Sequence, residues 1–434
     1  MALVIGSGMD ALRAAAMLAS TGASVCLLQE SETPHGLAHP ELDEGDGRLR
    51  IESSFRTAAE GVLGPLTEGE PVRRSVAKNG SLQALPLRRL GVARLFERDH
   101  FSDTGLRFLE RRLRNNLIPL TGEGQEERTY REWVIRRMGE PAYRHAYAPY
   151  AERRWGLKGD MLSVAVARAF HNPQSESPVL RVKAGPESAI ARATAVIENN
   201  GGEIVTSATV RAMEVKDGRV VSVRVGRKKY GAGDGPIWVA RTPSVVATWL
   251  GDALDSGGHV DANCLEAHDR VRIAMTASWD GAAEEVHLLD PDAVGFRVSR
   301  LPGNDTTVVV DLTMSPYAPD PNLDDVARCV RGLGWRDVDP TTARIERHHE
   351  WVPLWAPVVH PRLRRLSLSF RELGVAMVGR RGTFAPIGPG TELMIAARYS
   401  GDPDPDQREA MRVLFAPPVK DDDLDASFRD FIWR

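Results

Sequence analysis

The sequence predicts an α/β protein in which a parallel sheet, flanked by helices, is assembled from distant segments around an inserted α+β region. Three observations predict this class. The chain opens on a strand, a glycine turn, a helix and a second strand within its first thirty residues. Further apolar runs of the buried-strand type recur at 236–240 and 374–379. Between them lie a helix-rich segment and a segment of alternating strands, and 434 residues suggest roughly two to three domains.

The opening residues carry the most specific pattern. Leu3–Ile5 is a short apolar run of the kind that forms a buried parallel strand. Gly6, Ser7 and Gly8 follow directly, where the first glycine permits a tight turn and the second lets the backbone approach a pyrophosphate. The alanine-rich helix expected at 12–20 can point its N-terminal amides at such an anion. This order predicts a Rossmann-like unit.

The end of the second strand, expected at 25–28, matches this pattern less well. An acidic residue is expected there to accept the ribose hydroxyls, and by count Gln29 occupies its place. Glu30 comes one residue late, and neighbours in a strand point to opposite faces. Gln29 can still hydrogen-bond a hydroxyl, but without a charge. The pattern therefore predicts either an occupied dinucleotide site or a retained fold without a ligand.

Composition narrows the class of protein. The chain has 56 basic and 59 acidic residues and a net charge of −3, which favours neither a nucleic-acid partner nor an anionic membrane. Cys26, Cys264 and Cys329 are scattered, which suits a reducing compartment and disfavours a disulfide framework. We expect no signal peptide, because the first strand begins at once, and no membrane span, because apolar runs stay far below ~20 residues. We therefore expect a cytoplasmic protein.

The remaining elements follow from turn signals and periodicity. Asn79-Gly80 lies between two strand-like runs and is a strong hairpin signal, and the rest of 61–178 is helix-rich. A helix is expected at 188–198, strands at 203–205, 209–215, 219–225 and 236–240, and a helix at 244–250. Residues 262–372 alternate strands with one helix at 323–332, and 374–379 predicts a final buried parallel strand.

Several motifs carry a family resemblance that extends over nearly the whole chain. They are the glycine turn, Arg73–Ser75 with Asn79-Gly80, Tyr147–Tyr150 with Arg153–Leu157, Gly185-Pro186, His287–Asp290 and Gly379–Gly382. Together they resemble the two-domain flavoprotein superfamily that includes protoporphyrinogen oxidases, monoamine oxidases, carotenoid desaturases and UDP-galactopyranose mutase. The resemblance implies a Rossmann-like FAD/NAD(P)-binding domain (1–60, 180–255 and 373–412), an inserted α+β substrate domain (61–179 and 256–372) and a tail (413–434).

The resemblance also implies FAD as cofactor and a set of site residues. Those implied to bind the cofactor are Gly6, Ser7, Gly8, Met9, Gln29, Glu30, Gly36, Val210, Gly379, Arg380, Gly388 and Gly390. Arg153, Arg154 and Trp155 are the candidates for substrate binding, through a guanidinium fork and a stacked ring. The alternative for these three is a helix end with one solvated arginine and Trp155 in the core.

Departures from the family pattern cluster around the implied flavin. Besides Gln29, the double glycine after the second strand is replaced by His35-Gly36, and a glycine–histidine turn is replaced by Arg50–Phe55. The segment that opens a helix at the flavin pyrophosphate is replaced by Phe384–Glu392, where a carboxylate in the first turn competes for the positive helix end.

Two functions therefore stay open. The first is a flavin-dependent oxidoreductase or mutase acting on an apolar or nucleotide-sugar substrate, with no catalytic acid or base that can be named from the sequence. The second is a flavin-free binding or scaffold subunit. We expect no metal site, because His348 and His349 are adjacent in a strand and face opposite ways. Leu424 and the apolar residues within Phe428–Trp433 recur at helical spacing and predict a short amphipathic helix. It docks on its own domain or on a protein partner, or the tail stays disordered.

Overall fold

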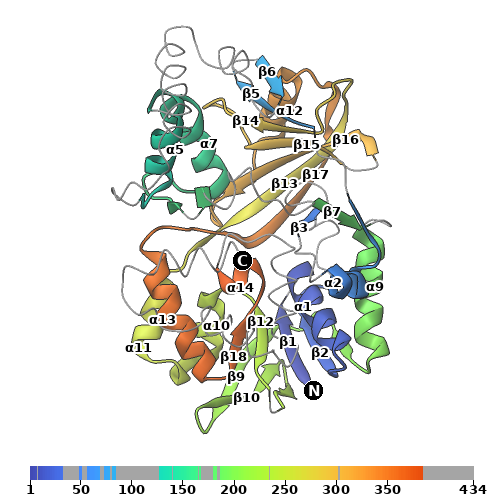
Figure 1. Cartoon of the computed structure of the whole chain (residues 1–434), viewed down its shortest axis with the longest axis vertical. Coiled ribbons are helices and arrows are strands. Elements are labelled where there is room, and N and C mark those ends of the chain that lie inside the picture. Colours follow the sequence, from blue (N-terminus) through green and yellow to red (C-terminus); the bar gives the residue numbers. More distant parts are fainter. Residues whose placement is uncertain are drawn as a thin grey trace, which may run out of the picture. The chain divides into compact units, whose positions relative to one another are not determined.

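The computed structural model of the chain describes residues 1–6, 8–32, 48–50, 56–68, 73–78, 81–84, 127–138, 140–164, 166–167, 179–182, 186–233, 235–301 and 304–384. The chain forms two compact units (Figure 1). Unit 1 comprises Met1–Glu70, Pro173–Glu266 and Val358–Arg434, and unit 2 comprises Pro71–Asn172 and Ala267–Pro357.

A five-stranded parallel sheet forms the centre of unit 1, in the order β18-β12-β1-β2-β8. Its strands are β1 (Ala2–Gly6), β2 (Val25–Gln29), β8 (Glu203–Val205), β12 (Ile237–Ala240) and β18 (Val375–Met377). All five match predicted strands. The strands β2 and β8, which come earlier in the sequence, lie on one side of β1, and the later strands β12 and β18 lie on its other side. The order therefore reverses between β1 and β12, where parallel sheets of this type bind ligands at the carboxyl ends of their strands.

Helices α1 (Met9–Ser20), α2 (Arg56–Leu63) and α9 (Pro186–Asn199) pack on one face of this sheet. Alternate strand residues, Val4, Leu27 and Trp238 among them, point into this core together with the alanines of α1. Small residues are favoured along α1 because the helix lies close to the strands beneath it. The predicted helix is thus confirmed, although it begins at Met9 and not at residue 12.

Unit 1 also contains two small sheets and further helices (Figure 1). A three-stranded antiparallel sheet contains β9 (Val210–Lys216), β10 (Arg219–Val225) and β11 (Lys228–Gly231), and a smaller one has the order β3-β7-β4. The strands of the latter are β3 (Arg48–Arg50), β4 (Leu66–Glu68) and β7 (Val179–Val182). The further helices in the described part of unit 1 are α10 (Pro243–Leu250), the 3-10 turn Gly251–Ala253, α11 (Ser256–Asn263), α13 (Val359–Glu372) and α14 (Gly379–Thr383).

Unit 2 is built on a seven-stranded sheet in the order β17-β13-β16-β15-β14-β5-β6, antiparallel except for the β14–β5 pair. The strands are β5 (Arg74–Lys78), β6 (Ser81–Ala84), β13 (Ala267–Ser278), β14 (Glu285–Leu288), β15 (Arg297–Leu301), β16 (Asn304–Met314) and β17 (Arg336–Pro353). Lys78 pairs with Ser81, which confirms the hairpin predicted around Asn79-Gly80.

The two faces of this sheet differ in polarity. On one face, Val271, Ile273, Val298 and Val310 form a core with α12 (Leu323–Gly332), the helix predicted at those residues. Among the described residues of unit 2, the helices outside this core are α5 (Tyr130–Met138), α6 (Glu140–Ala142), the π-helix Tyr143–Tyr147 and α7 (Ala148–Trp155). Strand residues alternate between faces, so the charged neighbours of these valines and isoleucines point away from α12.

The segment 262–372 differs from its prediction. It is predicted to alternate strands with one helix at 323–332, but α13 at its end is helical as well. Leu366 and Phe370 of α13 are four residues apart and buried, a helical spacing that the predicted strand pattern overlooked. A bidentate contact from Arg365 to Asp261 joins α13 to α11, with nitrogen–oxygen distances of 2.8 and 2.7 Å.

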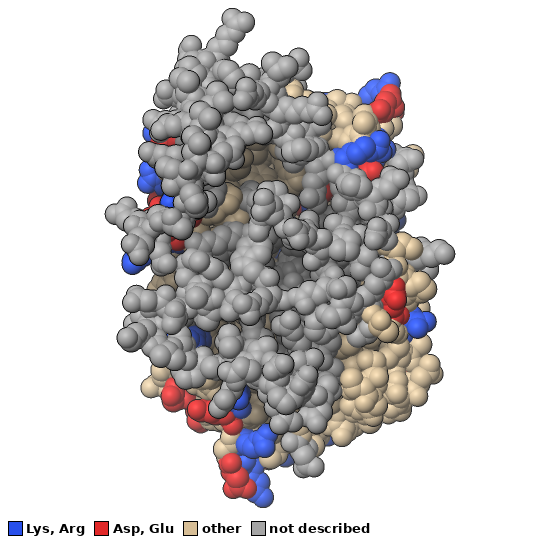
Figure 2. All heavy atoms as spheres, viewed as in Figure 1, with Lys and Arg blue, Asp and Glu red and all other residues tan. Residues whose placement is uncertain are grey.

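The described surface shows no large patch of a single charge in the view of Figure 2. On the face shown in Figure 2, basic and acidic side chains of the described residues lie intermixed, in keeping with the net charge of −3. None of the helices in the described ranges combines the length and the hydrophobicity that crossing a membrane requires.

The close approach of β1 to its neighbours gives a first prediction. A Cβ atom on Gly6 would lie 2.8 Å from Cβ of Ala240 and 2.9 Å from Cβ of Ala11. We expect Gly6→Ala to lower the free energy of unfolding by about 1–3 kcal/mol, because the strand and helix must move apart. Gly61→Ala in α2 is the matched control, since nothing lies within 4 Å of its added Cβ and alanine favours a helix. Equal melting temperatures of the two variants would contradict the prediction.

Candidate functional site

The glycine turn of unit 1 has the backbone that the sequence predicts. Gly8 is the N-cap of α1 and has a φ of 97°, a conformation that favours glycine. Gly6 is held between Ala11 and Ala240, so that α1 starts directly at the carboxyl end of β1. The register aligns Gly6 with Gln29 of β2 and with Ala240 of β12. The candidate site therefore lies where the strand order reverses.

Gln29 lies beneath this turn and is fully buried. Its Oε1 accepts a hydrogen bond from the backbone N–H of Gly8 at 3.3 Å and another from the Ser31 hydroxyl at 3.3 Å. Its Nε2 is buried and has no hydrogen-bond partner among the described residues. One of the amides at the start of α1 is thus satisfied by a side chain of the protein.

Asp10 occupies the first turn of α1 and is buried. Its Oδ1 accepts a hydrogen bond from the Ala11 N–H at 3.0 Å and lies 3.2 Å from Nη2 of Arg381 in α14. The carboxylate also lies against Gly379, where an added Cβ would be 2.6 Å from Oδ2. The positive end of α1 and the Arg381 guanidinium therefore both stabilise an anion that the chain itself supplies.

The other described residues predicted for the cofactor are placed as follows. Glu30 forms an ion pair with Arg241 at 3.1 Å, and its side chain is 20% exposed. Val210 is buried at the start of β9, and the nearby Ala208 N–H donates to the backbone carbonyl of Gln29 at 2.7 Å. Ser7, Gly36, Gly388, Gly390, the side chains of Met9 and Arg380, and the segment Phe428–Trp433 lie outside the described residues.

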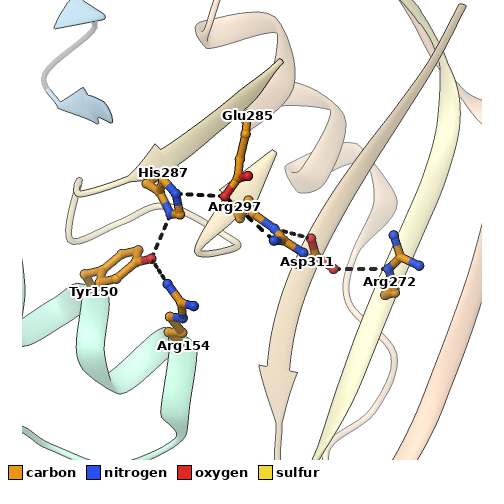
Figure 3. A network of polar contacts seen from close by, with 7 residues as sticks. All are labelled: Tyr150, Arg154, Arg272, Glu285, His287, Arg297 and Asp311. Carbon is orange, nitrogen blue, oxygen red and sulfur yellow. Dashed lines mark hydrogen bonds and ion pairs between the residues drawn. The ribbon is translucent and has the colours of Figure 1, made fainter. Parts of the chain in front are cut away.

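Unit 2 holds a second set of polar residues, on the sheet face opposite α12. The strand register brings Arg272, Asp311, Arg297 and His287 into one row across β13, β16, β15 and β14. Asp311 is fully buried, and its two oxygens lie 3.2 Å from Nε of Arg272 and 2.8 Å from Nε of Arg297. The row is therefore a buried ladder of cross-strand ion pairs (Figure 3).

The row continues into a chain of hydrogen bonds that reaches α7 (Figure 3). Nε2 of His287 lies 2.8 Å from Oε1 of Glu285, and Nδ1 of His287 lies 2.8 Å from the Tyr150 hydroxyl. A carboxylate only accepts, so Nε2 carries the hydrogen and Nδ1 accepts from Tyr150. The tyrosine oxygen in turn accepts from Nη1 of Arg154 at 2.7 Å. The donors thus run in one direction, from Arg154 through Tyr150 and His287 to Glu285.

The three residues predicted to bind a substrate lie at the end of α7. Trp155 is 1% exposed and packs against Tyr130, with ring centroids 5.3 Å apart. Arg153 donates to the carbonyls of Pro291 and Leu288 at 2.9 and 2.7 Å. Arg154 lies over the rings of Tyr150, Trp155 and Phe296 at 5.0–5.8 Å. Each side chain is held by contacts within unit 2, and their role in substrate binding stays a prediction.

The sequence motifs assign no individual role to Asp10, Arg381, Tyr150, Glu285 or His287. Asp10 follows the glycine turn and could have been noticed as a charge in a helix start that an anion would use. Glu285 and His287 are two residues apart in a strand, a spacing that places them on one face. Their partners come from distant segments, so the sequence contained no signal for the pairing itself. No group of three possible metal ligands occurs in the described ranges.

Comparison with solved structures identifies the architecture. Reduced UDP-galactopyranose mutase superposes with a TM-score of 0.69 at 12% identity, over 92% of each chain. Cyclohexylamine oxidase from Brevibacterium oxydans has a TM-score of 0.58 at 13% identity, over 92% of this chain and 98% of the oxidase. A fatty acid isomerase from P. acnes has a TM-score of 0.60 at 11% identity, over 94% and 97%. No protein-family model and no curated protein matches the chain.

The chain has the fold of the FAD-dependent amine oxidase-like flavoproteins. The resemblance in the motifs is thus confirmed at the level of the fold, as is the predicted α/β class. Identities of 11–13% show the fold alone, so the cofactor must be judged from the residues of this chain.

The described residues of unit 1 do not fit a bound flavin dinucleotide. The Gly6–Gly8 backbone suits a pyrophosphate, but the N–H groups of Gly8 and Ala11 already donate to Gln29 and Asp10. The Asp10 carboxylate is buried beside the same helix end and is paired with Arg381. A pyrophosphate would therefore meet a fixed negative charge and two occupied donors.

The buried pair gives a prediction about stability. The side chains of Asp10 and Arg381 are 4% and 5% exposed, whereas those of Glu30 and Arg241 are both 20% exposed. We expect Arg381→Met to lower the free energy of unfolding by about 3–5 kcal/mol, because it leaves a buried carboxylate without its cation. Arg241→Met is the matched control and should cost about 1 kcal/mol. Chemical denaturation of both variants measures the difference, and a smaller loss for Arg381→Met would contradict the burial argument.

The histidine of unit 2 gives a prediction about pH. Burial, the largest cause, lowers the pKa of His287, and the nearby Glu285 opposes this shift. The folded pKa is then below the unfolded value near 6.5, so the unfolded chain takes up the proton first. Stability should fall as the pH drops through about 6.5 towards the lowered pKa. Thermal melts between about pH 7 and pH 5 should show a shallower slope for His287→Gln than for the wild type.

His259→Gln serves as the control for this experiment, because its ring contacts the backbone carbonyl of Gly251 at 2.9 Å and not a carboxylate. Identical slopes for the wild type and His287→Gln would show that His287 contributes nothing to the acid sensitivity.

Proposed function

We propose that this chain is a flavin-free protein of the flavoprotein fold, which acts by binding, as a subunit or scaffold, and not by flavin chemistry. The observation that carries the proposal is the Asp10 carboxylate, buried in the first turn of α1 and held by Arg381. In a dinucleotide-binding unit, the pyrophosphate lies at this helix end. The chain supplies its own anion there.

The energies involved support this proposal. Like charges about 4 Å apart repel by roughly 4 kcal/mol at the effective dielectric constant of a protein surface. A pyrophosphate beside Asp10 would meet this repulsion. Moving the carboxylate aside would instead break its contacts with Arg381 and the Ala11 N–H, and breaking a buried pair costs about 3–5 kcal/mol. Either route opposes binding of the cofactor.

A second candidate function is supported by a different observation. The positive φ of Gly8, the crowded Gly6 and the buried Gln29 Nε2 without a partner among the described residues are features that a bound nucleotide would use. They favour a flavin-dependent oxidoreductase or mutase that acts on an apolar or nucleotide-sugar substrate. The neighbours named as oxidases and a mutase lend this candidate its reaction classes.

The absorbance spectrum of the purified full-length protein decides between the two. We expect no visible flavin absorbance, either as purified or after incubation with FAD and removal of the unbound cofactor. Fluorescence titration with FAD should show no saturable binding. A yellow protein, or saturable binding in the titration, would overturn the proposal in favour of the second candidate.

A variant tests whether the Asp10 carboxylate is what prevents the cofactor from binding. Asp10→Ser removes the carboxylate and leaves Arg381 beside the helix end, so we expect saturable binding of FAD or ADP at least about tenfold tighter than the wild type. Asp261→Ser is the matched control, because it breaks another aspartate–arginine pair of unit 1 at a different place. Like the wild type, it should show no saturable binding. Melting curves establish that both variants are folded before the titration.

A further inference from the structure

A pocket of about 450 Å³ lies within unit 2, and its lining shares no residue with the polar row of Figure 3. It is formed by α5, the π-helix Tyr143–Tyr147, the start of α7 and the turn around Gly159. This volume falls in the range of small-molecule sites. Single π-helical turns occur frequently at functional sites, because they redirect side chains. The pocket belongs wholly to unit 2 and is independent of the cofactor question in unit 1.

Tyr143 brings a polar group to the pocket that the protein does not use. The residue is 8% exposed and lines the pocket, and no hydrogen bond to its hydroxyl occurs among the described residues. Gly159 makes room for it, since an added Cβ would lie 2.6 Å from the hydroxyl oxygen. The Gly159 carbonyl accepts from the Arg131 N–H at 2.8 Å, which fixes this turn against α5. A hydroxyl that faces a pocket and has no hydrogen bond to a described residue is a group that a ligand can satisfy.

The charges around Tyr143 fall into two sets. Arg131 and Arg144 both lie near Glu140, at 3.4 and 3.7 Å, and so neutralise it. The side chains of Glu152, Lys158 and Asp160 also line the pocket, and none of them has a hydrogen bond or ion pair with a described residue.

The electrostatic effects on the Tyr143 hydroxyl agree with this grouping of the charged residues. Burial and then Asp160 raise the pKa of the Tyr143 hydroxyl, with Glu140 and Glu152 acting in the same direction against Arg131. The surroundings of the hydroxyl thus favour a positive charge over a negative one. A cation placed there would contact two carboxylates and the tyrosine oxygen.

We propose that this pocket binds a small zwitterion of the amino-acid type, which carries a primary ammonium group and a carboxylate. The ammonium group is held by Asp160, Glu152 and the Tyr143 hydroxyl, and the carboxylate by Lys158. Ala148, Pro149 and Pro291 form the apolar part of the lining, against which an aliphatic side chain can pack. Each group of the ligand then meets a protein group that is otherwise unused.

Three probes with matched carbon skeletons test the assignment on the full-length protein. Norleucine carries both groups, hexanoate lacks the ammonium group and 1-aminopentane lacks the carboxylate. Saturation-transfer NMR should detect norleucine binding, with hexanoate and 1-aminopentane each about three- to tenfold weaker. An absent norleucine signal from folded protein would overturn the proposal. Equal binding of 1-aminopentane and norleucine would also overturn it, because Lys158 would then have no role.

Variants of the pocket residues test whether norleucine binds in this pocket. Asp160→Asn and Tyr143→Phe should each weaken norleucine binding about three- to tenfold, and Lys158→Met should make norleucine no better than 1-aminopentane. Asp324→Asn is the matched control, since this exposed carboxylate lies in the first turn of α12 and outside the pocket. Thermal melts report folding of every variant. Norleucine affinity that is unchanged in Asp160→Asn and Tyr143→Phe would show that the zwitterion binds elsewhere.

Discussion

The close contact between β1 and its neighbours at Gly6 is the constraint on which unit 1 depends. The strand, the helix that follows it and β12 approach so closely that no side chain fits at this position. Because α1 starts at once, its N-terminal amides lie at the carboxyl edge of the sheet, beside the ends of β2 and β12. Everything that can bind at this edge, whether cofactor or protein side chain, is placed by that contact.

In this chain, side chains of the protein itself bind the amides at the carboxyl edge of the sheet. Asp10 and Gln29 accept the hydrogen bonds of two amides in the first turn of α1, and Arg381 neutralises the carboxylate. The same geometry that favours a pyrophosphate also favours a carboxylate, since both are anions at a positive helix end. A fold shared with flavoproteins is therefore compatible with a site that holds no flavin, and only the side chains distinguish the two cases.

Unit 2 shows how one sheet can serve two purposes. One face is apolar and packs on α12, whereas the other carries the row from Arg272 to His287 and its extension to Tyr150. Buried charges are tolerated there because each acid lies between bases: Asp311 contacts two arginines, and Glu285 contacts His287 and lies 3.7 Å from Arg297. Such a network holds the strands and α7 in a single arrangement, since a shift of any member would leave a charge without its partner.

The sequence by itself determined the local elements and the class of the fold. The apolar run at Leu3–Ile5, the glycine turn and the hairpin signal at Asn79-Gly80 are short-range patterns, and the structure has the predicted strands and hairpin at those places. The structure shows α13 to be helical, because the buried Leu366 and Phe370 repeat with a helical period within a segment assigned to strands. Only the tertiary structure decided the pairings of Asp10 with Arg381 and of Tyr150 with His287. These partners are 371 and 137 residues apart, and the contact between them depends on how distant strands pair, which no local pattern specifies.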